Sequence, residues 1–118
     1  LEIDAEIDFE NITGKFFRIL KQFQPFGPQN LAPLFISRNV KDTGYARLVG
    51  ANKEHIKMSL IQKDQPKTVF PAIAFNQANH YPEIHRGKEF DVCYSIEENN
   101  FRGNHTLQLN IKDLKIIN

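Results

Sequence analysis

The chain has 118 residues, of which 41% are hydrophobic and 25% charged, a composition typical of one soluble globular domain. The single cysteine, Cys93, excludes a disulfide framework, and we expect it to be a reduced, semi-buried residue of a cytoplasmic protein. No apolar run reaches the ~20 residues of a membrane-spanning helix, so we expect no membrane partner.

The start of the chain and its charge distribution suggest what kind of molecule it comes from. The sole methionine is Met58 and the first residue is Leu1, so we expect a piece of a longer protein. The net charge is only +1, but residues 1–10 hold five acids and no base, whereas residues 35–63 hold six bases and two acids. A basic central stretch is compatible with a polyanionic partner.

The N-terminal part combines a strand pattern with a helix pattern. Residues 3–8 alternate apolar and acidic, which favours a short edge strand whose other neighbour lies in the rest of the parent protein. Apolar residues then recur every three or four positions, which predicts an amphipathic helix over residues 9–24 with Asp8 as its N-cap. Pro25 ends this helix, and turn-forming residues predict a connector over 25–33.

After the connector the apolar pattern changes to period two, which predicts five strands. They cover, in chain order, residues 45–50, 55–60, 68–75, 90–96 and 106–111. A turn or two of helix fits between the third and fourth strands, before Pro82 interrupts it. This order predicts a mainly β fold, a five-stranded OB-fold Greek-key barrel over residues 31–118, with a helical connector segment over residues 1–30. An SH3-like barrel is the nearest competitor, but it lacks the long crossing between the third and fourth strands.

Groupings that could support catalysis or bind metal are weak. His80, Glu83 and His85 are close in sequence, but their spacing across a proline directs neither a helix face nor a strand face at one ion. Glu97 and Glu98 are adjacent, so in a strand they point to opposite sides instead of flanking a bond. The sequence contains no phosphate-binding glycine loop, nucleophile elbow or HExxH motif. We therefore expect no catalytic residue and no metal site in this fragment.

Basic, aromatic and amide residues gather on the predicted ligand side. OB-folds bind oligonucleotides or oligosaccharides with two loops, predicted here at 51–54 and 97–104, and with the strand face between them. In the second loop, Phe101 offers base stacking, Arg102 offers a guanidinium for phosphate, and Asn104 offers an amide for a base edge. Each has a structural alternative, since a loop phenylalanine can cap the barrel and a hairpin arginine can simply be solvated.

The first two strands add further candidates. If Ile56 and Met58 face the core, then His55 and Lys57 face outward toward the ligand, and Lys53 in the preceding loop can meet a phosphate. Arg47 and Tyr45 share one face, where either a surface stack of the two side chains or a ligand contact fits.

Several spaced motifs then fall into a familiar order: Pro25–Asn30 with Pro33–Phe35, Val49–Gly50 with His55–Lys57, Ala74–Asn76, and Asn100–Asn104 with Leu107–Leu109. Together, over about residues 9–114, they resemble the C-terminal OB-fold region of RecJ-type single-stranded-DNA-specific exonucleases. The resemblance implies a parent chain whose DHH and DHHA1 domains hold Mn²⁺ or Mg²⁺ and degrade DNA from 5′ to 3′. This sequence has no consecutive Asp-His-His and no Gly-Gly-His, so the accessory domain is implied, without a cofactor of its own.

The resemblance thus implies a module that guides single-stranded DNA to an active site outside this fragment, in a cytoplasmic repair nuclease. The expected DNA contacts are Arg47, Lys53, His55, Lys57, Phe101, Arg102 and Asn104. Expected partners are single-stranded DNA, the DHH and DHHA1 core of the parent chain, and repair or replication proteins. The alternative is a structural or protein-interaction module that closes the nuclease clamp or docks a repair partner without strong DNA binding. The small net charge favours that alternative.

Overall fold

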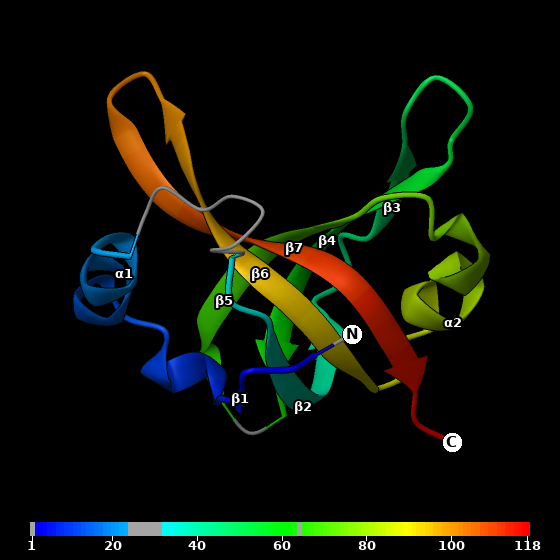
Figure 1. Cartoon of the computed structure of the whole chain (residues 1–118). Coiled ribbons are helices and arrows are strands. Elements are labelled where there is room, and N and C mark those ends of the chain that lie inside the picture. Colours follow the sequence, from blue (N-terminus) through cyan, green and yellow to red (C-terminus); the bar gives the residue numbers. More distant parts are fainter. Residues whose placement is uncertain (1, 24–31, 64) are drawn as a thin grey trace.

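The computed structural model describes residues 2–23, 32–63 and 65–118, which form a mainly β structure with two short α-helices (Figure 1). Its elements are β1 (Ala5–Glu6), α1 (Gly14–Lys21), β2 (Phe35–Asp42), β3 (Arg47–Val49), β4 (His55–Gln62), β5 (Gln65–Ala74), α2 (Tyr81–His85), β6 (Phe90–Phe101) and β7 (Asn104–Ile116). Two 3₁₀ turns occupy Phe9–Asn11 and Ala78–His80. The described residues thus contain seven strands, where an N-terminal edge strand and five further strands were predicted.

Some of the sequence predictions concern residues that the structure does not describe. The domain boundary predicted at residue 30 and most of the connector predicted over 25–33 lie outside the described residues. Within the described residues, no helix is both long and apolar enough to cross a membrane.

The strand pairings close on themselves. β2 pairs antiparallel with β6 and, near its end, with β4, and the ring is completed by the pairs β6–β7, β7–β5 and β5–β4. Within this ring β5 and β7 run parallel. β1 adds to β2 in parallel at the sheet edge, so the expected N-terminal edge strand is confirmed. Buried apolar side chains from all five ring strands form the core, among them Val40, Ile56, Ala72, Val92 and Leu109.

The strand predicted at residues 45–50 is present as β3, but the prediction that it is the first of the five is wrong, because β2 precedes it from Phe35. β2 and β3 both pair with β4, and together they form one long strand interrupted between Asp42 and Arg47. β2 was not predicted from the sequence, because two of its buried residues, Ser37 and Asp42, are polar and interrupt the apolar alternation. A bulge at Asn39, whose φ is 55°, also shifts which residues face the core.

The interruption between β2 and β3 is held by a buried carboxylate. Asp42 is only 7% exposed, and its Oδ2 accepts hydrogen bonds from the backbone N–H groups of Gly44 (2.7 Å) and Ala46 (2.8 Å). Its Oδ1 accepts a third from the N–H of Ser59 in β4, at 2.9 Å. These bonds replace the ladder bonds that the interruption removes, and they project Tyr45, which is 73% exposed, away from the core.

The single long helix predicted after Asp8 is also wrong, since a 3₁₀ turn and α1 take its place. The side chain of Asp8 makes no capping hydrogen bond to the turn that follows it. Thr13 is the N-cap of α1, where its Oγ1 accepts from the N–H of Phe16 at 3.1 Å. The helix is interrupted at Ile12 and Thr13, because their ψ of 84° and 169° lie outside the helical range.

Buried hydrogen bonds attach the N-terminal segment to the sheet. The side-chain Oε1 of Gln62 accepts from the N–H of Phe9 at 2.8 Å. The hydroxyl of Ser37 donates to the carbonyl of Ile7 at 2.6 Å, so the hydroxyl of Tyr94, 2.7 Å away, donates to Ser37. Burial raises the pKa of Tyr94 to about 12, which keeps that donor protonated. The segment therefore shares the core of the sheet.

Two further sequence predictions need correction. The loop predicted over 97–104 is mostly strand, since β6 and β7 pair as far as Phe101 and Asn104 and leave only Arg102 and Gly103 between them. This part of the hairpin extends beyond the core, so neither face carries a regular apolar pattern. A helical insertion between the third and fourth predicted strands is confirmed, but Pro82 lies in the first turn of α2, where the missing N–H has no intrahelical partner to lose.

The Asp42 hydrogen bonds give a stability prediction. Replacing Asp42 with Ala leaves three backbone donors without their acceptor, so the free energy of unfolding should fall by about 3 kcal/mol or more, measured by urea denaturation. Asp42→Asn keeps one acceptor oxygen and should lose less. Glu10→Ala, at an exposed acid of the first 3₁₀ turn, should change stability by under about 0.5 kcal/mol. Equal losses at both positions would contradict the role assigned to Asp42.

Candidate nucleic-acid interface

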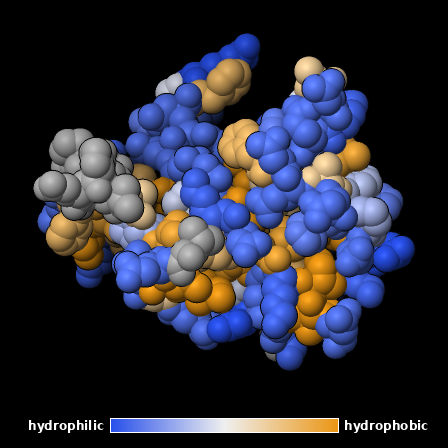
Figure 2. Space-filling view, turned by 45° about the vertical axis from the view of Figure 1, so that its right-hand side comes forward, coloured by the Kyte–Doolittle hydropathy of each residue, from blue (hydrophilic) through white to orange (hydrophobic). Residues whose placement is uncertain are grey.

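Two hairpins, β3–β4 and β6–β7, project from the same side of the molecule (Figure 1). The space-filling view shows two mostly hydrophilic projections on either side of a hollow (Figure 2). A groove of about 330 Å³ lies between them, with small side chains such as Ser59 and Ala72 from β4 and β5 on its floor. Its two walls carry Tyr45, Arg47 and Lys57 on one side and Asn99, Thr106 and Gln108 on the other. This places the groove over the strand face that the sequence predicted to carry the ligand.

The first wall is positively charged. Arg47 and Lys57 are direct cross-strand partners, and both are exposed, as the alternation of β4 predicted. Like charges placed opposite each other destabilise a sheet. Among the described residues neither side chain forms an ion pair with an acid, and no acidic residue lines the groove. The wall is therefore suited to an anion.

The turn that joins β3 to β4 is organised by His55. Its Nδ1 accepts from the backbone N–H of Asn76 at 2.9 Å, so the proton of the neutral ring is on Nε2, 3.0 Å from Oε1 of Glu54. The ring also packs edge-on against Phe75, with 5.0 Å between centroids. Both ring nitrogens thus have partners within the protein, and His55 supports the turn from which Lys53 projects at a φ of 56°.

The tip of β6–β7 is a two-residue turn with an unusual occupant. Arg102 and Gly103 have φ of 50° and 80°, the left-handed pair of a type I′ turn, where asparagine or glycine is usual at the first position. The guanidinium of Arg102 lies 5.1 Å from the ring centroid of Phe101, which is 68% exposed. Phe101 and Asn104 are cross-strand partners, and by strand alternation they share the face of Asn99, which lines the groove.

The wall residues of β6 and β7 were missed by sequence reasoning. Asn99 falls in the segment predicted as a loop, and Thr106 and Gln108 fall in the strand predicted over 106–111 but were not predicted to contact a ligand. Continuing the period-two pattern of β6 from Ile96 toward the tip would have placed Asn99 opposite the core. In the structure Nδ2 of Asn99 donates to Oε1 of Gln108 at 2.6 Å.

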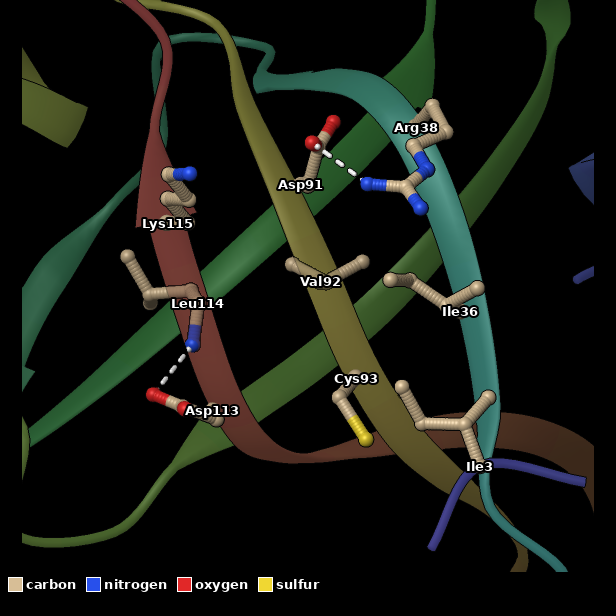
Figure 3. Close-up of a pocket in the computed structure, with 9 residues that line it drawn as sticks. All are labelled: Ile3, Ile36, Arg38, Asp91, Val92, Cys93, Asp113, Leu114 and Lys115. Carbon is tan, nitrogen blue, oxygen red and sulfur yellow. Dashed lines mark hydrogen bonds and ion pairs between the residues drawn. The ribbon is translucent and has the colours of Figure 1, made fainter. Parts of the chain in front are cut away.

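A second hollow, of about 310 Å³, lies over β2, β6 and β7 and is lined on one side by Ile3 (Figure 3). The positive charge of Arg38 in this hollow is already neutralised, because its guanidinium forms ion pairs with Asp91 at 3.1 Å and Glu6 at 3.2 Å. These carboxylates raise the pKa of Arg38. Cys93, free as expected, lines it, and burial raises the pKa of its thiol. The groove, with two unpaired cations, is the better candidate site.

The residues weighed as metal ligands take other positions. His85 stacks on Tyr81 with 5.2 Å between ring centroids, and its Nδ1 lies 3.3 Å from the Tyr81 hydroxyl. In the part of the chain that the structure describes, no three His, Cys, Asp or Glu side chains gather to hold a metal ion.

Comparison with known proteins shows to which family this chain belongs. A family model described as the RecJ OB domain matches residues 3–113. The chain belongs to the RecJ OB domain family. The single-stranded-DNA-specific exonuclease RecJ of Haemophilus influenzae is 42% identical over 64 residues, which make up 53% of this chain and 11% of that protein.

Solved structures agree on the fold. RecJ of Thermus thermophilus in complex with Mn²⁺ is 20% identical with a TM-score of 0.69, and the match covers 98% of this chain and 16% of that one. The same protein in complex with Mg²⁺ gives 23% identity and a TM-score of 0.60 over 86% of this chain and 14% of that one. The chain thus spans a small part of the length of each of these relatives.

Several of the motifs that suggested the RecJ family lie on the two hairpins that flank the groove. The Val49–Gly50 and His55–Lys57 motifs of this RecJ OB domain form the β3–β4 hairpin, and the Asn100–Asn104 motif forms the tip of β6–β7. The Pro25–Asn30 motif lies outside the described residues.

Gly50 offers a test of the β3–β4 turn. A Cβ there would collide with Glu54 and His55, and its φ of 100° is strained for any other residue. Gly50→Ala should therefore lower the free energy of unfolding by more than the ~1–3 kcal/mol of backbone strain alone, with shifted His55 NMR resonances. Gly87→Ala is the matched control, because its φ is 84° and no atom lies within 4 Å of the added Cβ. A smaller loss at Gly50 than at Gly87 would contradict the close packing.

Proposed function

We propose that this RecJ OB domain binds single-stranded DNA in the groove between β3–β4 and β6–β7 and guides it to a nuclease active site elsewhere in the parent chain. The observation that carries the proposal is the unpaired cross-strand pair of Arg47 and Lys57 on a groove wall without acids. A protein keeps such a repulsive pair at a cost in stability, which an anionic ligand offsets when it binds.

The remaining candidates extend this wall toward both hairpin tips. Lys53 and Arg102 add positive charge at the two turns, where phosphates of a longer strand can reach them. Tyr45 and Phe101 are the two most exposed large apolar side chains in the described residues, and both offer flat faces for base stacking. Asn104 adds an amide beside Phe101. Stacking accepts any base, so binding should show little sequence preference.

His55 takes a supporting role in this interface. Its ring holds the turn that carries Lys53, and its partners Glu54 and Asn76 leave neither nitrogen free for DNA in the unbound domain. We therefore propose that His55 contributes to binding through the position of Lys53.

The parent chain supplies the chemistry in this proposal. The family assignment supports a metal-dependent exonuclease of the cytoplasm, in which Mn²⁺ or Mg²⁺ is held by the DHH and DHHA1 core outside this fragment. The OB domain then acts without a metal of its own, and its partners are that core and the DNA strand.

A protein-interaction role is the competing function, and the surface of the N-terminal segment favours it. Ile3 and Ile19 are about half exposed, and the segment over residues 2–6 carries the exposed acids Glu2, Asp4 and Glu6. A repair protein could dock there without using the groove. Groove variants distinguish the two functions, because docking at the N-terminal segment does not depend on Arg47 or Lys57.

Fluorescence anisotropy of a labelled oligonucleotide tests the charged wall. The domain should bind single-stranded DNA with an affinity that falls as salt rises, by about 0.7 in log–log slope for each phosphate contacted. The double variant Arg47→Gln/Lys57→Gln should weaken binding and reduce that slope by about 1.4. Lys88→Gln, outside the groove, is the control and should bind like the parent chain. A salt slope unchanged by the double variant would refute the proposed interface.

The hairpin tip gives an independent prediction. Phe101→Ala should lose ~1–3 kcal/mol of binding if a base stacks there, with the salt slope little changed. Arg102→Asn keeps a residue that favours the left-handed turn, so the hairpin should stay folded while the salt slope falls by about 0.7. Thermal melting shows whether either variant alters folding. Normal folding with unchanged DNA affinity in both variants would favour the protein-docking function.

A further inference from the structure

We infer that the paired amides of Asn99 and Gln108 recognise the Watson–Crick edges of unpaired bases, and that this wall of the groove selects single strands against duplex. The inference rests on the proposed function, and it specifies which part of the nucleotide each wall contacts. It assigns a role to residues that lie between the basic wall and the aromatic tip.

The hydrogen bond between the two amides determines what they present to a ligand. With Nδ2 of Asn99 donating to Oε1 of Gln108, the carbonyl oxygen Oδ1 of Asn99 and the amino group Nε2 of Gln108 have no partner among the described residues. If both amides were reversed, the bond would persist and the pair would still present one acceptor beside one donor. Asn99 is exposed and Gln108 half-buried, and both line the groove, so this pair of groups is accessible from it.

Every DNA base carries a complementary pair of groups on its Watson–Crick edge. Adenine and cytosine each offer an amino donor beside a ring-nitrogen acceptor, and guanine and thymine each offer a ring N–H beside a carbonyl. One acceptor next to one donor therefore fits all four bases, in one orientation or the other. In duplex DNA these edges are occupied by the opposite strand, so only an unpaired base can use the amides.

The charges on the two walls also favour a DNA orientation in which the bases face Asn99 and Gln108. Arg47 and Lys57 attract phosphates to the β3–β4 wall. On the hairpin, Glu97 is the cross-strand partner of Gln108 and lies on the same face, where its Oε2 accepts from Asn110 at 3.1 Å. Glu97 is not among the residues that line the groove, but its carboxylate lies next to Gln108 and disfavours phosphate near this wall. A strand bound with its backbone toward the cations turns its bases toward Asn99 and Gln108, while Tyr45 offers a stacking face.

The test compares three oligonucleotides of equal length: oligo-dT, oligo-dT methylated at N3, and an abasic strand. Methylation at N3 removes the edge donor of thymine but keeps its stacking face and the phosphates. The parent chain should bind oligo-dT roughly three- to ten-fold more tightly than the methylated strand, the effect of one or two net hydrogen bonds. The double variant Asn99→Leu/Gln108→Leu should bind both at the weaker level, and its preference for single strand over duplex should shrink by the same factor.

Asn100→Leu is the matched control, since Asn100 pairs with His105 on the opposite face of the same hairpin. It should retain the parent's discrimination, and all variants should bind the abasic strand equally, because phosphate contacts are intact. Equal binding of methylated and unmethylated oligo-dT by the parent chain would overturn this inference while leaving the proposed function standing. An equal loss of discrimination in Asn100→Leu would also overturn it. Absence of binding to all three strands at low salt would instead refute the proposed function.

Discussion

The carboxylate of Asp42 holds the point at which the first long strand is interrupted. Three backbone N–H groups converge on it, two from the interruption and one from β4. Without this acceptor one buried and two part-buried donors would be left unpaired, a cost comparable to much of the net stability of a small domain. With the acceptor in place, β2 can pair with β6 as well as β4, and the ring of strands closes. The same bonds place Tyr45 and Arg47 at the groove.

A second set of buried polar groups attaches the N-terminal segment to this ring. Gln62 and Ser37 both come from ring strands, and they satisfy backbone groups of Phe9 and Ile7 that would otherwise be desolvated. The bonds fix where Phe9 enters the core, and its ring then contacts Tyr94 edge-on. Polar side chains thus set the geometry, while the apolar side chains supply most of the driving force for folding.

The groove exists because two hairpins continue beyond the core that supports their bases. Their outer parts are stabilised by ladder bonds and turn geometry, with few buried apolar contacts. Such ribbons can carry exposed aromatic, amide and like-charged side chains that a buried strand could not accommodate. The two walls differ in charge: Arg47 and Lys57 line one of them, and Glu97 is the cross-strand partner of Gln108 next to the other. That asymmetry gives the groove a phosphate side and a base side.

The sequence by itself determined the mainly β class, because the alternation around Ile56 and Met58 is typical of a strand with one buried face. Its spaced motifs determined the RecJ resemblance. It also placed Lys57 outward. Only the tertiary structure revealed β2. Its Ser37 and Asp42 are polar and look like surface residues in the sequence, but both are buried because they form hydrogen bonds with groups on other strands. The long hairpin was hidden for the opposite reason, since a ribbon that leaves the core has no buried face to impose a pattern. Period-two alternation of apolar residues indicates a strand with one buried face. The pattern is absent where the buried residues are polar and hydrogen-bonded, or where the strand does not face a core.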